Sequence, residues 1–384
     1  MKNKVIFIIM LVFNQITINS QNQNSMKFHL PFHIEIDPME RLLLINIEKD
    51  PDSIYIGFEP QYYQDAKTGT GHLIIAWRED GKVDVYHQKS LNISPENYDI
   101  VGKGLSELIE TEMPKAFFEI GSNGVEAHYV FKDKYHREIE LRVSENNQSE
   151  RKPFGLLAPM GSAAENPKSL PLILLNDFYF VREKNTEINI SINQHKHKAD
   201  KLPIRMDGNK MLFSRYSPEP LIARLNPETN DALNFVEIYQ NQDSVSKENI
   251  RCFFLWENNL PRLTRMVFDN DKHPITLKFT NAMPEMLQLE TNAVFETDFI
   301  ISAFPTTGLL SGKIKMQKNE SSISMQLKPS GGWIQKADKF SLKFLYTFVK
   351  VFKSWPKTYL WTAEIKSLQN DNLHIQSHWK RTNK

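Results

Sequence analysis

Short runs of alternating apolar and polar residues, separated by turn formers, recur along almost the whole chain. This two-residue period is typical of β-strands, and segments with helical spacing are few. The pattern predicts an all-β fold of two antiparallel β-barrel or sandwich modules. A chain of 384 residues is long for one domain. Because the window 193–211 is polar and rich in turn formers, we expect the modules to span residues 21–200 and 201–384.

The clearest hairpin is "GHLIIAWREDGKVDVYHQ". Asp80-Gly81 predicts a two-residue turn, because these two residues tolerate the positive φ that such a turn has at both positions. Counting outward from this turn sets Trp77 opposite Asp84. Both faces of the pair carry apolar side chains, so we expect one face to meet a core and the other a second layer or a cavity.

One segment near the C-terminus, "ADKFSLKFLYTFVKVFKSW", has helical spacing. The spacing predicts a helix that ends at Pro356, with lysines on one face. Its other face is apolar and carries Phe340, Phe344, Leu345, Phe348, Val351 and Phe352. A basic amphipathic helix can lie on a membrane. We favour packing on a sheet with the lysine face in solvent, and peripheral membrane contact stays open as the alternative. "GKGLSELIETEMP" predicts one further short helix near residue 105.

The first residues, "MKNKVIFIIMLVFNQITINSQ", place lysines before a short apolar run and a polar end. This layout predicts a signal peptide over residues 1–20 and a secreted or periplasmic protein. Cys252 is the only cysteine and has no internal disulfide partner; in "IRCFFLW" we expect a small buried side chain rather than a nucleophile. The formal charge of +1 provides no field for nucleic acid, so no nucleic-acid partner is expected.

Motifs for familiar catalytic classes are absent: the sequence has no phosphate-binding loop, GxSxG, HExxH or calcium loop. No cofactor is therefore expected. His195 and His197 in "QHKHK" share a strand face and can chelate a metal. The neighbouring lysines oppose a cation, so we favour a solvated loop or hairpin tip and expect no metal.

Two histidines lie within patterned strands, each beside a tyrosine: Tyr86-His87 and His128-Tyr129. A strand histidine that faces a cavity can act as a general acid or base near neutral pH. The alternative, which we favour, is a core or rim histidine bonded to a backbone carbonyl. Trp77 joins these residues as a candidate cavity wall.

Two arginines follow or precede aromatic residues. Arg182 ends "NDFYFVR", after Asp177 and Tyr179, and Arg215 precedes Tyr216 in "FSRYSPEP". A guanidinium among aromatic rings can bind a carboxylate or stack in a ligand pocket. An ion pair at a barrel end is the alternative, and we favour it.

The stretch "KPFGLLAPMGSAAENPKSLPLILLNDFYFV", residues 152–181, carries two apolar arms around a centre of small residues and turn formers. A solvated linker would not carry such arms. We expect two buried segments of the N-terminal module, joined by a loop at a pocket mouth or a domain interface.

Two successive β modules, the "ADKFSLKFLYTFVKVF" helix before the closing strands and a "GGW" at a strand edge resemble tandem lipocalin-like (calycin-type) exported proteins, the carotenoid hydratase-like group. The resemblance is one of architecture. It implies a cavity for an apolar or amphipathic ligand and, in some relatives, addition of water to an isoprenoid double bond. That chemistry needs a buried carboxylic acid with a raised pKa.

The leading functional hypothesis is an exported binding protein for a hydrophobic or amphipathic small molecule or lipid. The alternatives are a hydratase or isomerase of lipid-like substrates on the same scaffold, or a glycan-binding or glycan-active protein that uses paired carboxylates and the tryptophans of the C-terminal half. Whether the protein is an enzyme stays open from the sequence.

Overall fold

The computed structural model describes residues 25–148, 150–158, 163–269, 273–337, 339–348, 357–367 and 372–382. Within these residues almost all regular structure is β-strand, and the one α-helix is α1 (Phe340–Phe348). The predicted all-β class with one helix near the C-terminus is confirmed. The expected signal peptide, residues 1–20, lies outside the described residues.

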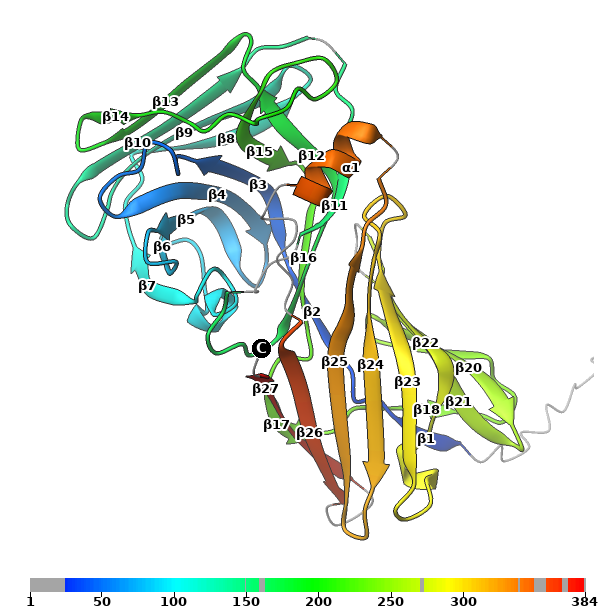
Figure 1. The fold of residues 1–384 in the computed structure, drawn as a ribbon. Helices are drawn as coiled ribbons and strands as arrows, with labels where there is room; N and C mark the ends of the chain where they lie inside the picture. The colour runs from blue at the N-terminus through cyan, green and yellow to red at the C-terminus, as the bar shows by residue number, and fades with distance from the viewer. Residues whose placement is uncertain are drawn as a thin grey trace, which may run out of the picture.

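The N-terminal module consists of a curled sheet and a second layer that covers it (Figure 1). The curled sheet runs in the order β15 (Met211–Ser217), β3 (Met39–Asn46), β4 (Tyr55–Asp65), β5 (Gly69–Arg78), β6 (Val83–His87) and β7 (Leu105–Glu110). The second layer runs in the order β14 (His195–His197), β13 (Thr186–Ile192), β10 (Glu138–Glu145), β9 (Gly124–Lys132) and β8 (Lys115–Gly121).

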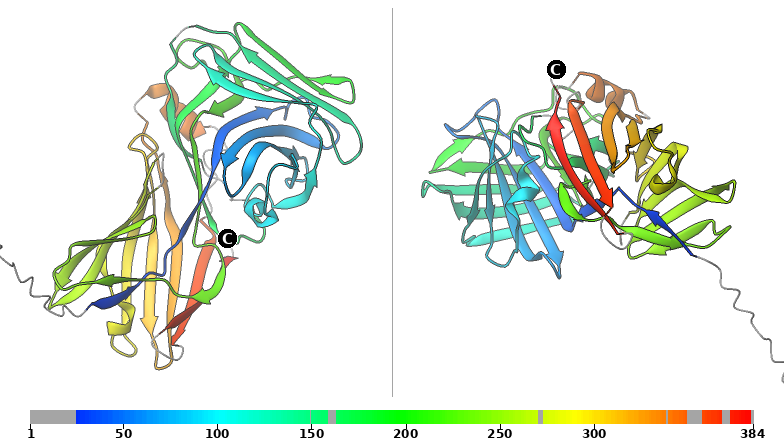
Figure 2. Two further views of the ribbon diagram at one scale, coloured as in Figure 1. Left: turned by 180° about the vertical axis from the view of Figure 1, so that it is seen from behind. Right: turned by 90° about the horizontal axis from the view of Figure 1, so that it is seen from below.

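The C-terminal module is one antiparallel sheet whose strands are mostly neighbours in sequence. Its order is β17 (Thr229–Ala232), β27 (Leu373–Arg381), β26 (Tyr359–Ser367), β25 (Ser322–Ile334), β24 (Leu309–Lys318), β23 (Val294–Ser302), β22 (Ile275–Pro284), β21 (Leu260–Phe268), β20 (Ile250–Glu257) and β19 (Ser244–Lys247). The first strand, β1 (Met26–His29), pairs with β18 (Phe235–Ile238) and lies against this module (Figure 2). The 3-10 turn η2 (Met286–Gln288) follows β22.

Four strands join the modules: β2 (Ile34–Asp37), β11 (Phe154–Ala158), β12 (Leu170–Arg182) and β16 (Pro220–Leu225). The side chains of β12 alternate between two cores, so that Leu172 packs with the C-terminal module and Ile173 with the N-terminal one. Pairing also crosses residue 200, because β15 bonds to β3 and β1 bonds to β18. The boundary between residues 200 and 201 stays a prediction.

The hairpin of β5 and β6 has both faces buried, as the sequence predicts. Ile74 packs in the core between the curled sheet and the second layer, which we call the interlayer core. Ile75 packs in the core on the opposite face of the curled sheet, which we call the junction core. The predicted register is wrong by one residue, since Trp77 lies opposite Val83. Gly81 takes a positive φ of 87° as the third residue of a three-residue loop. The extra loop residue shifts every cross-strand pair of the hairpin by one, so side chains of β6 share a face with different side chains of β5 than predicted.

The expected helix near residue 105 is wrong. That segment forms β7, which pairs in parallel with β6. Its predecessor is the short 3-10 turn η1 (Pro95–Tyr98). Backbone hydrogen bonds to the edge strand β6 stabilise the extended conformation more than the weak helical propensity of this segment stabilises a helix.

The predicted buried face of α1 is wrong for Phe340 and Phe348 and right for Leu345. Leu342, Leu345 and Tyr346 are buried, whereas Phe340 and Phe348 are exposed. Residues three and four apart share a helix face, and the sheets hold the face that carries the leucines. Residues 349–356, which the sequence assigns to the same helix, lie outside the described residues.

Candidate functional site

A cleft lies where the joining strands separate the two modules. It has a volume of about 1180 Å³ and is lined by β2, the end of β4, residues 92–98, the two residues before β12 and part of β16. We call it the junction cleft. Isoleucines and prolines supply the apolar part of the wall, and charged, hydroxyl and amide side chains supply the polar part.

Asp37 at the end of β2 is a half-buried carboxylate in this cleft. Its Oδ1 accepts a hydrogen bond from the backbone N–H of Met39 at 3.2 Å, and its Oδ2 accepts one from the hydroxyl of Tyr63 at 3.4 Å. Burial raises the pKa of Asp37 to about 6, although these hydrogen bonds and the charge of Arg224 act in the opposite direction. Asp37 therefore gains and loses its proton close to neutral pH.

Other groups around the cleft have defined roles. Arg224 on β16 forms an ion pair with Glu35 at 2.5 Å. Ser169 is buried and lines the cleft, and its hydroxyl has no hydrogen-bond partner among the described residues. Burial also raises the pKa of Asp99, next to η1, to about 6. The lining thus combines Arg224, which is paired with Glu35, the lysines Lys67 and Lys168, the hydroxyl of Ser169 and the Asp37 carboxyl with its raised pKa.

A chain of polar side chains runs from the cleft into the junction core. The hydroxyl of Tyr63 donates to Gln61 Oε1 at 2.9 Å, and Gln61 Nε2 donates to Glu59 Oε1 at 2.8 Å. The indole N–H of Trp77 donates to Glu59 Oε2 at 3.3 Å. The three β4 residues are spaced by two, so they point to one face of the strand. We call Asp37, Tyr63, Gln61 and Glu59 the polar chain.

Glu59 is buried, and desolvation raises its pKa to about 7 despite the nearby charge of Arg215. Arg215 is itself desolvated, which lowers its pKa to about 10. The hydroxyl of Tyr63 carries one proton and faces the acceptors Gln61 and Asp37 as well as the hydroxyl of Tyr98. When Asp37 is protonated, it can donate to Tyr63, and Tyr63 can then donate to Gln61 without conflict.

The sequence predicts ten residues for the site, and two of them interact with Glu59 of the polar chain. Trp77 donates a hydrogen bond to Glu59, and the charge of Arg215 lies near it. Tyr86 and Tyr129 are buried in the interlayer core. The Tyr86 hydroxyl bonds to that of Tyr55 at 2.7 Å, and the Tyr129 hydroxyl bonds to Nδ1 of His72 at 3.0 Å. These tyrosines pack two sheet layers together and line no part of the junction cleft.

The predicted histidines lie apart from the cleft. His87 Nδ1 faces the carbonyl oxygen of its neighbour Gln88 at 3.0 Å, and His128 Nε2 faces Glu140 Oε1 at 3.1 Å on the second layer. Within the described residues no group of three or more His, Cys, Asp or Glu side chains can hold a metal ion. His195 and His197 contact each other on β14, with ring centroids 4.9 Å apart.

Three of the remaining predicted residues, Tyr179, Arg182 and Tyr216, gather around Glu145 rather than in the cleft, whereas Asp177 lies near Glu219 and His273. The rings of Tyr179 and Tyr216 stack with centroids 5.4 Å apart. Glu145 accepts hydrogen bonds from the Tyr216 hydroxyl at 3.3 Å and from the backbone N–H of Arg182 at 3.1 Å. Burial raises the pKa of the Asp177 carboxyl, which lies on the same strand as Tyr179. This set ties β12 and β15 to the second layer.

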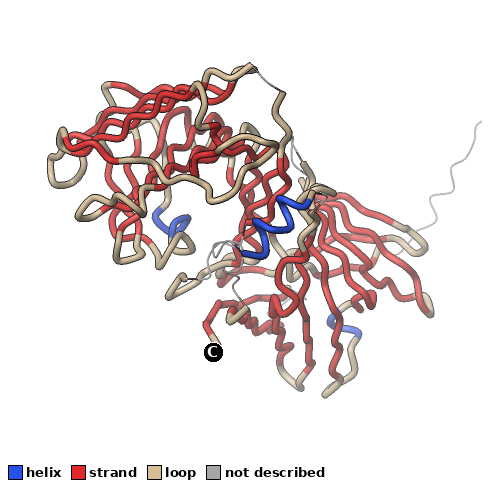
Figure 3. The backbone as a smooth tube through the Cα atoms, turned by 45° about the horizontal axis from the view of Figure 1, so that its top comes forward, coloured by secondary structure: helices blue, strands red, loops and turns tan. Residues whose placement is uncertain are grey.

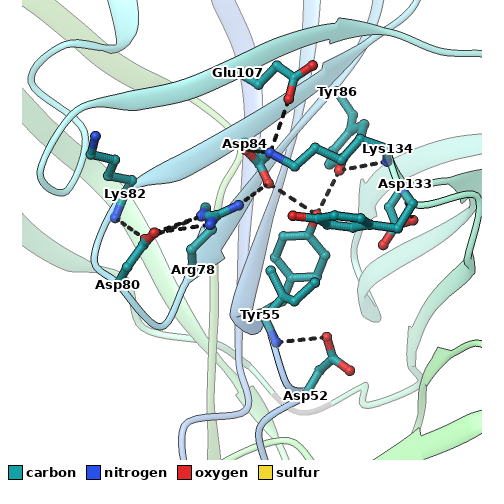
Figure 4. A network of polar contacts seen from close by, with 12 residues as sticks. Asp52, Tyr55, Arg78, Asp80, Lys82, Asp84, Tyr86, Glu107, Asp133 and Lys134 are labelled. Carbon is teal, nitrogen blue, oxygen red and sulfur yellow. Dashed lines mark hydrogen bonds and ion pairs between the residues drawn. The ribbon is translucent and has the colours of Figure 1, made fainter.

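A second polar network joins the hairpin of β5 and β6 to the second layer (Figure 4). Its centre is Asp84, whose side chain is fully buried. Asp84 accepts from Arg78 Nη1 at 3.1 Å, from Lys134 Nζ at 2.9 Å and from the Tyr55 hydroxyl at 3.2 Å. Lys134 also pairs with Glu107 at 3.1 Å. Both oxygens of Asp84 are occupied by partners from the protein, so we assign this network a structural role.

In the C-terminal module Cys252 is fully buried, and burial raises the pKa of its thiol to about 12. Such a thiol is inert at physiological pH. No helix among the described residues is long and apolar enough to span a membrane.

Comparison with known proteins finds no matching family model, no matching curated protein and no matching solved structure. The geometry of the chain itself therefore carries the functional argument. The junction cleft is where a wide cavity, partly apolar walls and a carboxyl with a raised pKa, that of Asp37, coincide.

Proposed function

We propose that the protein is an exported binding protein for an amphipathic small molecule or lipid, which it holds in the junction cleft. A volume of about 1180 Å³ is sufficient for a small organic ligand. Ile36 and Ile93 offer apolar contact, and Asp37 and Arg224 offer polar contact within the same cleft. This union of apolar walls with a few convergent polar groups is the observation that carries the proposal.

The ligand site proposed here differs from the cavity expected from the sequence. Trp77, Tyr86 and Tyr129 contribute to the packed cores instead. None of the tryptophans among the described residues lines the junction cleft, so a tryptophan platform for glycans gains no support there. A mixed apolar and polar cleft favours an amphipathic ligand over a purely apolar one.

A second candidate is acid catalysis in the same cleft, which the pKa of Asp37 favours. A carboxyl with a pKa of about 6 is well matched to proton transfer near neutral pH. Addition of water to a double bond, or its isomerisation, begins with protonation of carbon, and Asp37 is the group that would donate that proton. The resemblance to tandem lipocalin-like proteins, with its hydratase relatives, stays a prediction.

Native mass spectrometry tests the binding proposal on protein purified from its own compartment, followed by organic extraction and identification of any co-purified molecule. Asn92→Trp, on the exposed wall of the cleft, should fill part of the cleft and lower the bound fraction. Asn234→Trp, exposed on the C-terminal module and outside the cleft, is the matched control. Equal ligand content in both variants would place the ligand elsewhere, and ligand-free wild-type protein would contradict the proposal.

The extracted molecule also separates binding from catalysis. Asp37→Asn should retain the ligand and lose turnover if Asp37 is the acid. Unchanged conversion of the ligand by this variant would remove Asp37 from any mechanism.

A further inference from the structure

The helix α1 lies on the outside of the strands at the junction of the two modules (Figure 3). One of its faces is anchored. Leu342 and Leu345 are buried in the junction core, and the Tyr346 hydroxyl donates to the carbonyl oxygen of Gly155 at 2.5 Å. The ring of Tyr346 also packs edge-on against Trp333, with centroids 4.8 Å apart. These contacts fix which face of the helix points outward.

The outward face is apolar. Phe340 is 83% exposed and Phe348 is 63% exposed, and Phe344 lies between them along the helix. The three are spaced by four residues, so they form one ridge. The Phe344 and Phe348 rings contact each other with centroids 4.5 Å apart. A helix that is apolar on its outer face as well as its inner one is unusual at a protein surface in water.

Basic side chains accompany the ridge. Lys336 and Lys343 are exposed, and Lys339 pairs with Asp207 at 3.2 Å. Between residues 334 and 348 the sequence has three lysines and one acidic residue, Asp338. Three lysines set against Asp338 and Asp207 leave one net positive charge beside the ridge.

We propose that the phenylalanine ridge of α1 is a docking surface for a lipid bilayer that carries anionic headgroups. Phenylalanine rings on an interfacial helix enter the boundary between headgroups and acyl chains, and lysines beside them bind the headgroups. A second copy of the chain fits less well, because pairing two ridges about a twofold axis would bring lysines of like charge together. The proposal does not depend on the function of the junction cleft, which lies elsewhere in the molecule.

Co-sedimentation with vesicles tests this surface. The full-length protein should sediment with vesicles made of equal parts phosphatidylcholine and phosphatidylglycerol, and less with vesicles of phosphatidylcholine alone. The double variant Phe340→Ser/Phe348→Ser should bind the mixed vesicles about tenfold more weakly or worse, since binding scales with the apolar area inserted. Phe117→Ser, at a phenylalanine that is 44% exposed on the edge strand β8, is the matched control and should bind like the wild type.

Charge is tested separately. Lys336→Glu/Lys343→Glu should weaken binding, and added salt should weaken wild-type binding. Circular dichroism confirms that each variant is folded. Wild-type protein that stays in the supernatant, or a phenylalanine double variant that binds as well as the wild type, would overturn the proposal. A dimer that forms with rising concentration and is lost in the double variant would assign the ridge to a second copy instead.

Discussion

Replacement of Glu59 with glutamine should change the stability of the protein in opposite directions at low and at high pH. Glu59 is 4% exposed, and burial raises its pKa from 4.5 to about 7. A pKa that is higher in the folded state means that folding favours the protonated form. The contribution of Glu59 to stability is therefore fully present below about pH 4.5 and is lost as the pH rises through about 7.

The size of this effect follows from the shift. At about 1.4 kcal/mol for each pKa unit, ionised Glu59 destabilises the folded protein by about 3 kcal/mol near pH 8. Glutamine avoids this cost because it does not ionise. Its NH2 group cannot accept a hydrogen bond, however, so one of the two donors, Gln61 or Trp77, loses its partner at a cost of about 1 kcal/mol. Glu59→Gln should be about 2 kcal/mol more stable near pH 8 and about 1 kcal/mol less stable near pH 4.

Urea denaturation followed by tryptophan fluorescence measures this difference across the pH range. The two unfolding curves should cross near about pH 5, where the ionisation cost equals the cost of the lost hydrogen bond. Glu119→Gln, at a side chain that is 56% exposed, is the control and should stay within about 0.5 kcal/mol of the wild type. A Glu59→Gln variant that is less stable by the same amount at every pH would refute the reasoning.

Three further predictions concern single groups. Tyr63→Phe should raise the pKa of Asp37 above about 6, because Asp37 loses a hydrogen bond to its ionised form, and an unmoved pKa in a carbon NMR titration contradicts the assignment. The same variant should lower the free energy of unfolding, measured by urea denaturation, by about 1 to 3 kcal/mol, because Gln61 Oε1 loses its donor. Asp84→Asn should lower stability by about 3 kcal/mol, because two cations lose a buried partner, and a loss near zero in urea denaturation contradicts that role. Cys252 should resist a thiol reagent in the native protein and react after denaturation, and rapid native labelling would show that it is accessible.

The strand content and the two-sided burial of the β5–β6 hairpin could be predicted, because both follow from local alternation. The register of that hairpin could not, since "EDGK" is compatible with a two-residue turn or with a three-residue loop that has Gly81 at its end. The outward face of α1 was equally undetermined. Apolar residues occur on more than one side of the helix, and the face that is buried depends on contacts with Trp333 on β25 and with Gly155, which is far away in sequence.

The candidate site was mostly beyond sequence reasoning. Asp37 and Glu59 look like solvated strand residues, and the curl of the sheet and the pairing of β2 with β16 bury them. One signal was present: "FEPQYYQD" alternates polar groups on the face that also carries Tyr63. The strand pattern predicts that Tyr86 and Tyr129 face a cavity, because the sequence does not reveal that a second sheet covers them.

Hydrogen exchange tests most directly whether the junction cleft holds the ligand. Deuterium uptake is compared between protein purified from its own compartment and the same protein after ligand extraction. Extraction should raise the uptake of residues 34–38 and 92–98, which line the cleft, and leave the strands of the C-terminal sheet unchanged. An increase confined to segments outside the cleft, or no change in any segment, would contradict the proposed site.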